Sequence, residues 1–427
     1  MDPLRHDSSG FGRRLNRWLA WFAGLLALAT SLAVAVPPTA QAAAAPAGST
    51  AATGSSRHDD EVLRAALQAV VDAGASGAIA LVDDGEHRRE VAVGSARLDP
   101  PEAIRTVDQV RVGSITKTAM ATITLQLVGE GRLSLHDSVE HWLPGVVPNG
   151  SAITIQMLLN HTSGIFNYTN DQEFFATLIA HPFRHWTPPE LIAVANAHPP
   201  VFPPGQGWSY SNTNYILIGL VLEAVTGQPV QELVANRIVR PLHLRHTFFA
   251  TSAAFRGPYA HGYAPPSISG DGYLDLSGWS PSWGWAAGAL VSNAGDLARF
   301  YRALLSGRLL RPALLQRMLT TVDTGVGIRY GLGIFTVATP CGTLWGHDGS
   351  IPGYLSFAYN DRSGSRSMVV LIPTQPDQAI LQALGQANLV AVCQMFDQEV
   401  PASAAAGTGA ATVSPWLHLI DKPVALP

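Results

Sequence analysis

The sequence predicts an α/β (α+β) fold in which one α/β lobe is interrupted by a helical lobe. Strand-like runs rich in β-branched and aromatic residues stand near both ends of the chain. Short helical segments and loops rich in Pro, Gly and Asn fill the region between them. We therefore expect one domain over residues 59–400, with the α/β lobe at about 59–128 and 286–400 and the helical lobe at about 129–285.

The first 58 residues are typical of a targeting segment and a linker. Arginines precede the uncharged apolar run 18–36, and the small residues Ala40 and Ala42 fit the rule for signal cleavage. We expect residues 1–42 to be a signal peptide and residues 43–58 to be a small-residue linker. An uncleaved membrane anchor is the alternative, because nineteen apolar residues can also span a bilayer. Either way the protein is expected outside the cytoplasm: secreted, extracellular and associated with the cell wall.

The elements of the folded region follow in chain order. The stretch 59–74 places Val62, Ala66 and Val70 on one face, which predicts a helix. Alternating or continuous apolar runs predict strands, and these lie at 77–85, 89–98, 330–339, 343–349, 354–360 and 367–374. A last helix is expected at 377–396, and residues 401–427 have the composition of a flexible tail.

Composition excludes several functions. The net charge is −4, only 14% of residues are charged, and Lys and Arg do not cluster beyond the first seventeen residues, so we expect no nucleic-acid partner. His181 and His185 have helical spacing, but Pro182 lies between them and the glutamate of a zinc-protease helix is missing, so no metal is expected. We also expect no cofactor, no stable membrane span after signal cleavage, and a monomer.

Lysine usage draws attention to one serine. The chain has two lysines, and Lys422 lies in the predicted tail, which leaves Lys117 alone in the folded region. Ser114 precedes it by three residues, on the same face of a predicted helix that begins at the serine. A serine hydroxyl needs a base to become a nucleophile. Lysine can serve when burial and a helix N-terminus lower its pKa, whereas arginine stays protonated. Taken alone, this pattern is also compatible with a helix-capping serine and a solvated lysine.

Two further motifs narrow the choice. The segment YSN lies at 210–212 before an apolar helix, and HDG lies at 347–349 on a predicted strand. With SITK at 114–117, their order and spacing resemble the penicillin-recognising serine hydrolases. That group comprises class C β-lactamases, exported D-alanyl-D-alanine carboxypeptidases and related esterases. LLNHTSGI at 158–165 and GALVSNAGDLARF at 288–300 resemble further segments of this family.

The resemblance runs over about residues 59–400 and implies a β-lactamase/DD-peptidase-like fold. Such a fold has an antiparallel sheet flanked by helices, with an inserted helical lobe. It also implies a disulfide between Cys341 and Cys393, which agrees with the even cysteine count of an exported chain.

The resemblance assigns catalytic roles to individual residues. Ser114 would form an acyl-enzyme, and Lys117 would hold and tune its proton. Tyr210 would act as general base and then as acid, with a pKa lowered by Lys117 and His347. His347 stands where other members carry a lysine and is expected to be catalytic, with a hydrogen-bonding residue of its strand as the alternative.

Substrate contacts follow from the same resemblance. Asn212 would bind the acyl-amide side chain of the substrate. Gly349 would let the substrate lie against its strand. The backbone N–H groups of Ser114 and Ser350 would form an oxyanion hole.

The choice of substrate depends on two features. The first is a group of aromatic residues that could wall a substrate pocket: Trp279, Trp283, Trp285, Phe166 and Tyr354. The alternative is that the tryptophans fill the interface between the lobes. We expect Trp285 to contact the substrate. In the resembling carboxypeptidases the middle residue of the last motif is commonly a hydroxyl, and an arginine on the neighbouring strand binds the terminal carboxylate. Here that middle residue is Asp348, which would repel a carboxylate. Arg329 or Arg366 could compensate from nearby.

We therefore expect an exported serine hydrolase most like a D-alanyl-D-alanine carboxypeptidase acting on peptidoglycan peptides. A class C-type β-lactamase, a small-ester esterase and a non-catalytic penicillin-binding sensor are the alternatives. The expected ligand is a small peptide, a β-lactam or an ester.

Overall fold

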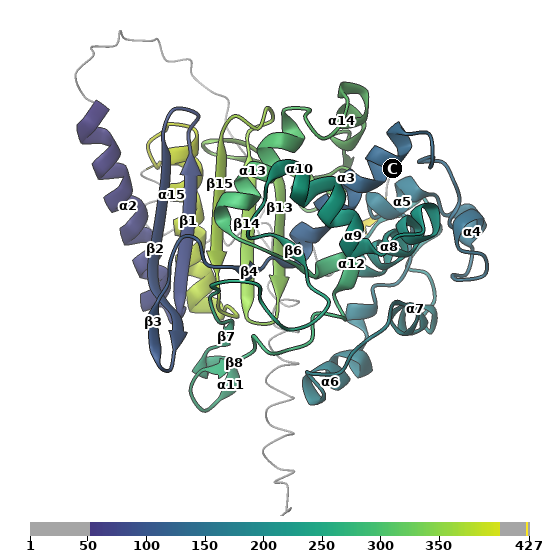
Figure 1. The fold of residues 1–427 in the computed structure, drawn as a ribbon, viewed down its shortest axis with the longest axis horizontal. Coiled ribbons are helices and arrows are strands. Elements are labelled where there is room, and N and C mark those ends of the chain that lie inside the picture. Colours follow the sequence, from purple (N-terminus) through teal and green to yellow (C-terminus); the bar gives the residue numbers. More distant parts are fainter. Residues whose placement is uncertain (1–51, 402–423, 426–427) are drawn as a thin grey trace, which may run out of the picture.

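A nine-stranded antiparallel sheet forms the centre of the molecule, which we describe from a computed structural model covering residues 52–401 and 424–425 (Figure 1). The strands lie in the order β10-β11-β12-β13-β14-β15-β1-β2-β3. Their bounds, in that order, are Val322–Asp323, Arg329–Tyr330, Phe335–Thr339, Gly342–Ile351, Tyr354–Asn360, Ser367–Ile372, Gly77–Asp83, Arg88–Leu98 and Pro101–Ala103. Strands from the two ends of the chain meet where β1 pairs with β15, with Ile79 opposite Leu371. This confirms the predicted mixed fold with an antiparallel sheet and helices.

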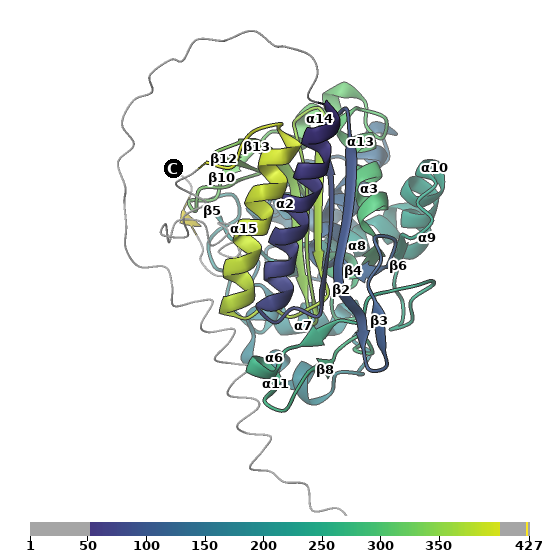
Figure 2. The same cartoon turned by 90° about the vertical axis from the view of Figure 1, so that its left-hand side faces the viewer.

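Helices cover both faces of the sheet. The helices α2 (Ala52–Asp72) and α15 (Gln378–Met395) lie side by side on one face, and α13 (Ala294–Leu305) packs on the other (Figure 2). The side chains of β1 alternate between these layers: Ala80 belongs to the core under α2 and α15, and Leu81 to the core on the opposite side. Because both sides are buried, β1 is apolar up to its last residue, Asp83, and shows no polar alternation.

Most of the helices between β3 and β10, apart from α13, gather at one end of the sheet (Figure 1). Two of them are central: α3 (Thr116–Gly129), which is buried almost along its whole length, and α8 (Asn212–Thr226). Threonines in α3 return their hydroxyl hydrogens to backbone carbonyls, as Thr122 does to Thr118, so the buried helix satisfies its polar groups. The other α-helices are α4 (Val139–Trp142), α5 (Ile155–Leu159), α6 (Gln172–Ala180), α7 (Pro188–Asn196), α9 (Val230–Val234), α10 (Arg240–Leu242), α11 (Pro266–Ser269), α12 (Trp285–Gly288) and α14 (Pro312–Met318).

Short elements complete the chain. They are the helical turns η1 (Gly113–Ile115), η2 (Gly150–Ala152), η3 (Tyr168–Asn170) and η4 (Ala235–Val239), and the strands β4 (Val110–Arg111), β5 (Gly207–Trp208), β6 (Phe248–Phe249), β7 (Tyr263–Ala264), β8 (Leu274–Asp275), β9 (Leu290–Ser292) and β16 (Val424–Ala425).

The expected strand 330–339 is divided into β11 and β12 by a glycine turn. Gly333 adopts a φ of 68°, and a Cβ atom there would lie 2.5 Å from the Cβ of Ala121 on α3. Gly331 leaves a similarly narrow space, since its Cβ would lie 2.2 Å from the carbonyl oxygen of Met318. The turn therefore packs this edge of the sheet against α3. It interrupts the strand between β11 and β12, because the backbone has to leave the extended conformation to make this contact.

A disulfide joins Cys341, in the turn between β12 and β13, to Cys393 on α15, with 5.1 Å between the Cα atoms. The predicted pairing is thereby confirmed. Within the described residues, no helix has both the length and the apolar character needed to cross a bilayer. The predicted signal peptide and most of the predicted tail lie outside those residues.

Candidate active site

Ser114 lies where the backbones of η1 and β13 come into close contact. Gly113 precedes it with a φ of 50°, and a Cβ there would lie 3.0 Å from the backbone nitrogen and oxygen of Ser350. On the facing strand, a Cβ on Gly349 would lie 2.0 Å from the oxygen of Val112 and 2.9 Å from the nitrogen of Ser114. Only glycine at both positions allows this approach, which brings the backbones of Ser114 and Ser350 to the same place.

Lys117 is fully buried on the first turn of α3, beside the serine. Its Nζ lies 2.9 Å from Ser114 Oγ, 2.8 Å from Asn212 Oδ1 and 2.8 Å from the carbonyl oxygen of Ala287. Burial holds the pKa of Lys117 well below its ordinary value of 10.5, although the Asp348 carboxylate acts in the opposite direction. The lowered pKa agrees with the direction expected from the sequence.

Lys117 Nζ has three oxygen neighbours. The oxygens of Asn212 and Ala287 can only accept, so each takes an N–H hydrogen from Lys117. Ser114 Oγ accepts the third hydrogen when Lys117 is protonated, and its hydroxyl can donate to the lone pair in the neutral amine that burial favours. The arrangement therefore places a base at hydrogen-bond distance from a serine nucleophile.

Tyr210 lies against the same pair, with its ring centre 4.9 Å from Lys117 Nζ and 7% of its surface exposed. Burial raises the pKa of Tyr210 well above 10, and its hydrogen bond with the Ser114 side chain only partly offsets this effect. The expectation of a lowered pKa is therefore wrong. Its physical reason is that desolvation of the phenolate outweighs the positive neighbours on which the expectation relied, so Tyr210 is a neutral phenol in the free protein.

His161, to which the motifs assign no role, supports the loop that carries Tyr210. Its ring is completely buried, 4.4 Å from the Tyr210 ring centre, and its Nδ1 accepts hydrogen bonds from Ser211 N–H and from the amide of Asn214, both at 3.2 Å. Burial lowers the pKa of His161 well below 6.5, so the ring is neutral and Nδ1 is free to accept. Its signal in the sequence was the LLNHTSGI segment.

His347 does not reach the pocket. Its side chain is 1% exposed, its Nδ1 lies 2.6 Å from the carbonyl oxygen of Asp348, and its Nε2 lies 2.8 Å from Tyr330 Oη. A carbonyl can only accept, so Nδ1 carries a hydrogen and donates it to the Asp348 carbonyl, while Nε2 pairs with the Tyr330 hydroxyl. The predicted direct catalytic contact is therefore corrected: the residue faces the interior because strand alternation turns Asp348, its neighbour, toward the pocket.

A pocket opens beside Ser114 and is walled mainly by apolar side chains. Strand β13 contributes Asp348 and Ser350, and Tyr210 and Asn212 border the same space. The apolar wall comes from α6, the loop before α12, and the sheet; its members are Phe175, Leu178, Ile179, Trp279, Trp283, Ile351, Leu355 and Phe357.

The expected aromatic wall is present only in part. Trp279 and Trp283 line the pocket, but Trp285 packs against α8, where a Cβ on Gly219 would lie 2.6 Å from its ring. Trp285 is therefore corrected from a substrate contact to a residue of the helical interface. Tyr354 is buried and donates to the carbonyl of Ala260. Phe166 stacks on His198, with 3.9 Å between the ring centres.

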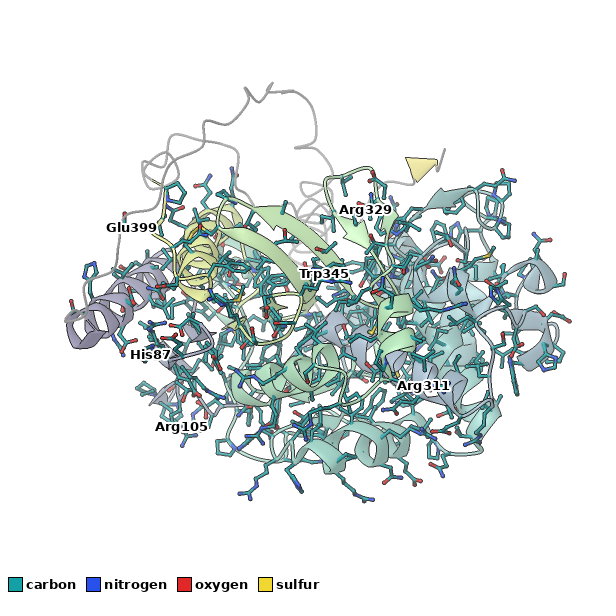
Figure 3. All side chains as sticks on the ribbon, turned by 90° about the horizontal axis from the view of Figure 1, so that it is seen from above. His87, Arg105, Arg311, Arg329, Trp345 and Glu399 are labelled. Carbon is teal, nitrogen blue, oxygen red and sulfur yellow. A yellow bond between two sulfur atoms is a disulfide. The ribbon has the colours of Figure 1, made fainter. Side chains whose placement is uncertain are left out.

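Neither arginine that was expected to compensate for Asp348 lines the pocket. Arg329, on β11, donates to Thr321 and lies 3.8 Å from Asp323 (Figure 3). Arg366 donates to the carbonyl of Met395 on α15.

Comparison with known proteins agrees with this geometry. A family model described as Beta-lactamase matches residues 63–391. The chain is 26% identical to penicillin-binding protein 4* of Bacillus subtilis (strain 168), over 72% of this chain and 71% of that protein. It spans about half to two thirds of the length of several other curated relatives.

Two solved structures are similar over most of their own length. A D-stereospecific amidohydrolase from Streptomyces sp. is 41% identical, with a TM-score of 0.70 over 76% of this chain and 98% of that chain. The D-amino acid amidase from Ochrobactrum anthropi SV3, complexed with L-phenylalanine, is 25% identical, with a TM-score of 0.70 over 79% of this chain and 98% of that chain.

Proposed function

The chain belongs to the β-lactamase family of serine hydrolases, and from this premise we propose that it hydrolyses small amides of D-configured amino acids through an acyl-enzyme on Ser114. The observation that carries the acyl-enzyme chemistry is the set of three contacts made by Lys117 Nζ. The similarity to the Streptomyces amidohydrolase, over nearly the whole of that protein, supports the amide substrate and its D configuration. The apolar wall of the pocket suits a large apolar side chain.

Acylation begins with Lys117. Its neutral amine accepts the Ser114 proton while Oγ attacks the amide carbonyl carbon, and a tetrahedral intermediate forms. The negative charge that develops on the carbonyl oxygen is stabilised by the backbone N–H groups of Ser114 and Ser350, which the two glycines bring together. Because those donors are fixed before reaction, they need not reorganise as the charge appears.

Tyr210 completes the proton transfers. As a neutral phenol beside Ser114, it donates its proton to the leaving nitrogen as the C–N bond breaks, and the Lys117 ammonium returns a proton to the phenolate. Water then attacks the carbonyl carbon of the Ser114 ester, and the neutral amine of Lys117 accepts the proton of that water. Ser114 regains its hydrogen when the acid product leaves.

The pocket favours an amide hydrolase over the carboxypeptidase that the motif order suggests. A carboxypeptidase has to bind a terminal carboxylate, and no lysine, arginine or histidine is among the described residues that line the pocket. We retain export as a proposal, supported by the apolar run 18–36 and by the Cys341–Cys393 disulfide, which persists in oxidising compartments.

The test is release of ammonia from D-phenylalaninamide, with L-phenylalaninamide as the stereochemical control. We expect hydrolysis of the D form, and loss of roughly 10³-fold or more in Ser114→Ala while the thermal melting temperature stays near that of wild type. Intact-protein mass after mixing with benzylpenicillin separates the alternatives. A stable adduct without amide hydrolysis would favour a penicillin-binding carboxypeptidase, and rapid loss of the drug without an adduct would indicate a β-lactamase; either result would overturn the proposal.

A further inference from the structure

Asp348 is the only residue in the described pocket wall whose side chain carries a charge at neutral pH. The remaining polar members are hydroxyl and amide groups, namely Ser114, Tyr168, Thr169, Tyr210, Asn212, Ser350 and Gln375. A substrate that enters this pocket therefore meets one negative charge, and no cation on the wall balances it. In a pocket with largely apolar walls, that charge acts over a longer range than it would in water.

The protein itself leaves the Asp348 carboxylate weakly partnered. Its side chain is 19% exposed, and the one ion pair recorded for it within residues 52–401 is with His347 Nδ1, 3.5 Å from Oδ1. The hydrogen on that nitrogen is already directed to the Asp348 carbonyl oxygen at 2.6 Å, and Nε2 pairs with the Tyr330 hydroxyl, so neither ring nitrogen is recorded donating a hydrogen bond to the carboxylate. A carboxylate that is four-fifths covered loses hydration that a cationic ligand would replace.

The position of Asp348 relative to Ser114 indicates which substrate cation it meets. Asp348 and Ser350 are two residues apart on β13, so both side chains point to the pocket face of the strand. The backbone of Ser350 lies at Gly113, beside the nucleophile. A substrate carbonyl held there carries its α-amino group two bonds from the carbonyl carbon. In an amino-acid amide the α-ammonium is thus the cation closest to the scissile bond, and it enters the pocket that both Ser114 and Asp348 line.

We infer that Asp348 binds the free α-ammonium group of the substrate, so that the enzyme acts on amino-acid amides and on the amino-terminal residue of short peptides. The inference rests on the proposed amide hydrolysis and specifies its substrate class. The same carboxylate repels substrates whose reacting residue carries a nearby carboxylate. Asp348 is a specificity residue, and it takes no part in the proton transfers among Ser114, Lys117 and Tyr210.

The experiment compares D-phenylalaninamide with 3-phenylpropanamide, which has the same skeleton without the amino group. For wild type we expect kcat/KM to be roughly 10- to 100-fold higher for the amine-bearing substrate, the range for a hydrogen bond to a charged group. Asp348→Asn should reduce this ratio to near one, mainly through KM for D-phenylalaninamide, and Asp348→Glu should restore part of it. Asp323→Asn, on an exposed strand away from the pocket, is the matched control and should keep the wild-type ratio.

A second measurement needs no variant. Because an α-ammonium loses its proton near pH 8, the wild-type ratio of kcat/KM for the two substrates should fall above that pH, and enzyme groups that affect both substrates cancel in the ratio. A ratio near one at pH 7, or a ratio unchanged in Asp348→Asn, would overturn the inference while leaving amide hydrolysis intact. If wild type cleaves neither amide, the proposed function itself fails.

Discussion

Burial sets the protonation states of the two residues that would move the Ser114 proton. Lys117 and Tyr210 both lie inside the protein, and burial disfavours the ammonium of one and the phenolate of the other. Burial therefore favours the uncharged form of both groups, one suited to act as a base and the other as an acid. In that form neither group has to lose a charge before proton transfer begins.

Lys117→Arg should be inactive. A guanidinium keeps its proton in proteins and is larger than the amine that fits between Ser114 and Asn212. We expect kcat for D-phenylalaninamide to fall by roughly 10³-fold or more, and no acyl-enzyme to be detected by intact mass after mixing with a reactive ester. An Arg variant that keeps wild-type turnover would exclude Lys117 as the base.

The pH dependence of stability gives an independent test of the neutral amine. Because the pKa of Lys117 is lower in the folded than in the unfolded chain, the unfolded state binds the extra proton between the folded pKa and 10.5. In that window the free energy of unfolding of wild type should rise by about 1.4 kcal/mol per pH unit relative to Lys117→Met. Urea denaturation of both proteins at pH 7, 8 and 9 measures this difference. Parallel pH profiles would mean that the folded lysine is protonated.

For single residues, the sequence predicts which side chains form the site better than it predicts their pKa values. Ser114, Lys117, Tyr210 and Asn212 could be named from short motifs, and the structure brings these four together. The pKa of Tyr210 could not be predicted, because the burial that raises it comes from residues far apart in the chain.

The aromatic wall shows the same limit. Trp283 and Trp285 are two residues apart and look alike in the sequence. One lines the pocket and the other packs on α8, because the short helix α12 begins between them.

Among the elements, β13 and η1 form the contact on which the oxyanion site depends. Gly349→Ala would place a Cβ 2.0 Å from the backbone oxygen of Val112, and a backbone atom cannot rotate away as a side chain can. We expect the strand to move away from Ser114 and kcat for D-phenylalaninamide to fall by roughly 10²-fold or more, as for loss of an oxyanion donor.

The matched control for that change is Gly257→Ala, whose added Cβ would meet nothing closer than Gln109 at 3.5 Å. It should retain wild-type kcat. If Gly349→Ala is equally active, as judged by initial rates of ammonia release, the close approach of β13 is not needed for catalysis.

The pattern of apolar residues predicts most of the helices and strands, because each apolar segment is long enough to show a helical or a strand spacing. The strands β1, β2, β14 and β15 and the final helix α15 lie within a few residues of their expected bounds. The break between β11 and β12 was missed, because it exists to fit Gly333 against Ala121 on α3. A packing contact between segments more than 200 residues apart leaves no local period in the sequence.

For the whole molecule, the strands from the two ends of the folded region meet inside the sheet. Pairing of β1 with β15 joins residues almost 300 positions apart, and α2 packs beside α15 over the same junction. The candidate active site lies farther along the sheet, between β13 and the helical region. The junction of the chain ends therefore contributes stability without contributing a residue to the pocket.

The disulfide acts at this largest scale and should separate stability from catalysis. Cys341 and Cys393 close a loop of 52 residues, and the chain-entropy model assigns such a crosslink about 4 kcal/mol. Both cysteines are buried in apolar surroundings, so the double variant Cys341→Ala/Cys393→Ala removes the crosslink without adding polar groups. We expect its free energy of unfolding in urea to fall by about that amount, with kcat at 20 °C unchanged because neither cysteine lines the pocket.

The control is wild type treated with a reductant, whose free energy of unfolding should approach that of the double variant. A fall in kcat together with the fall in stability would mean that the crosslink also fixes the position of β13 relative to Ser114.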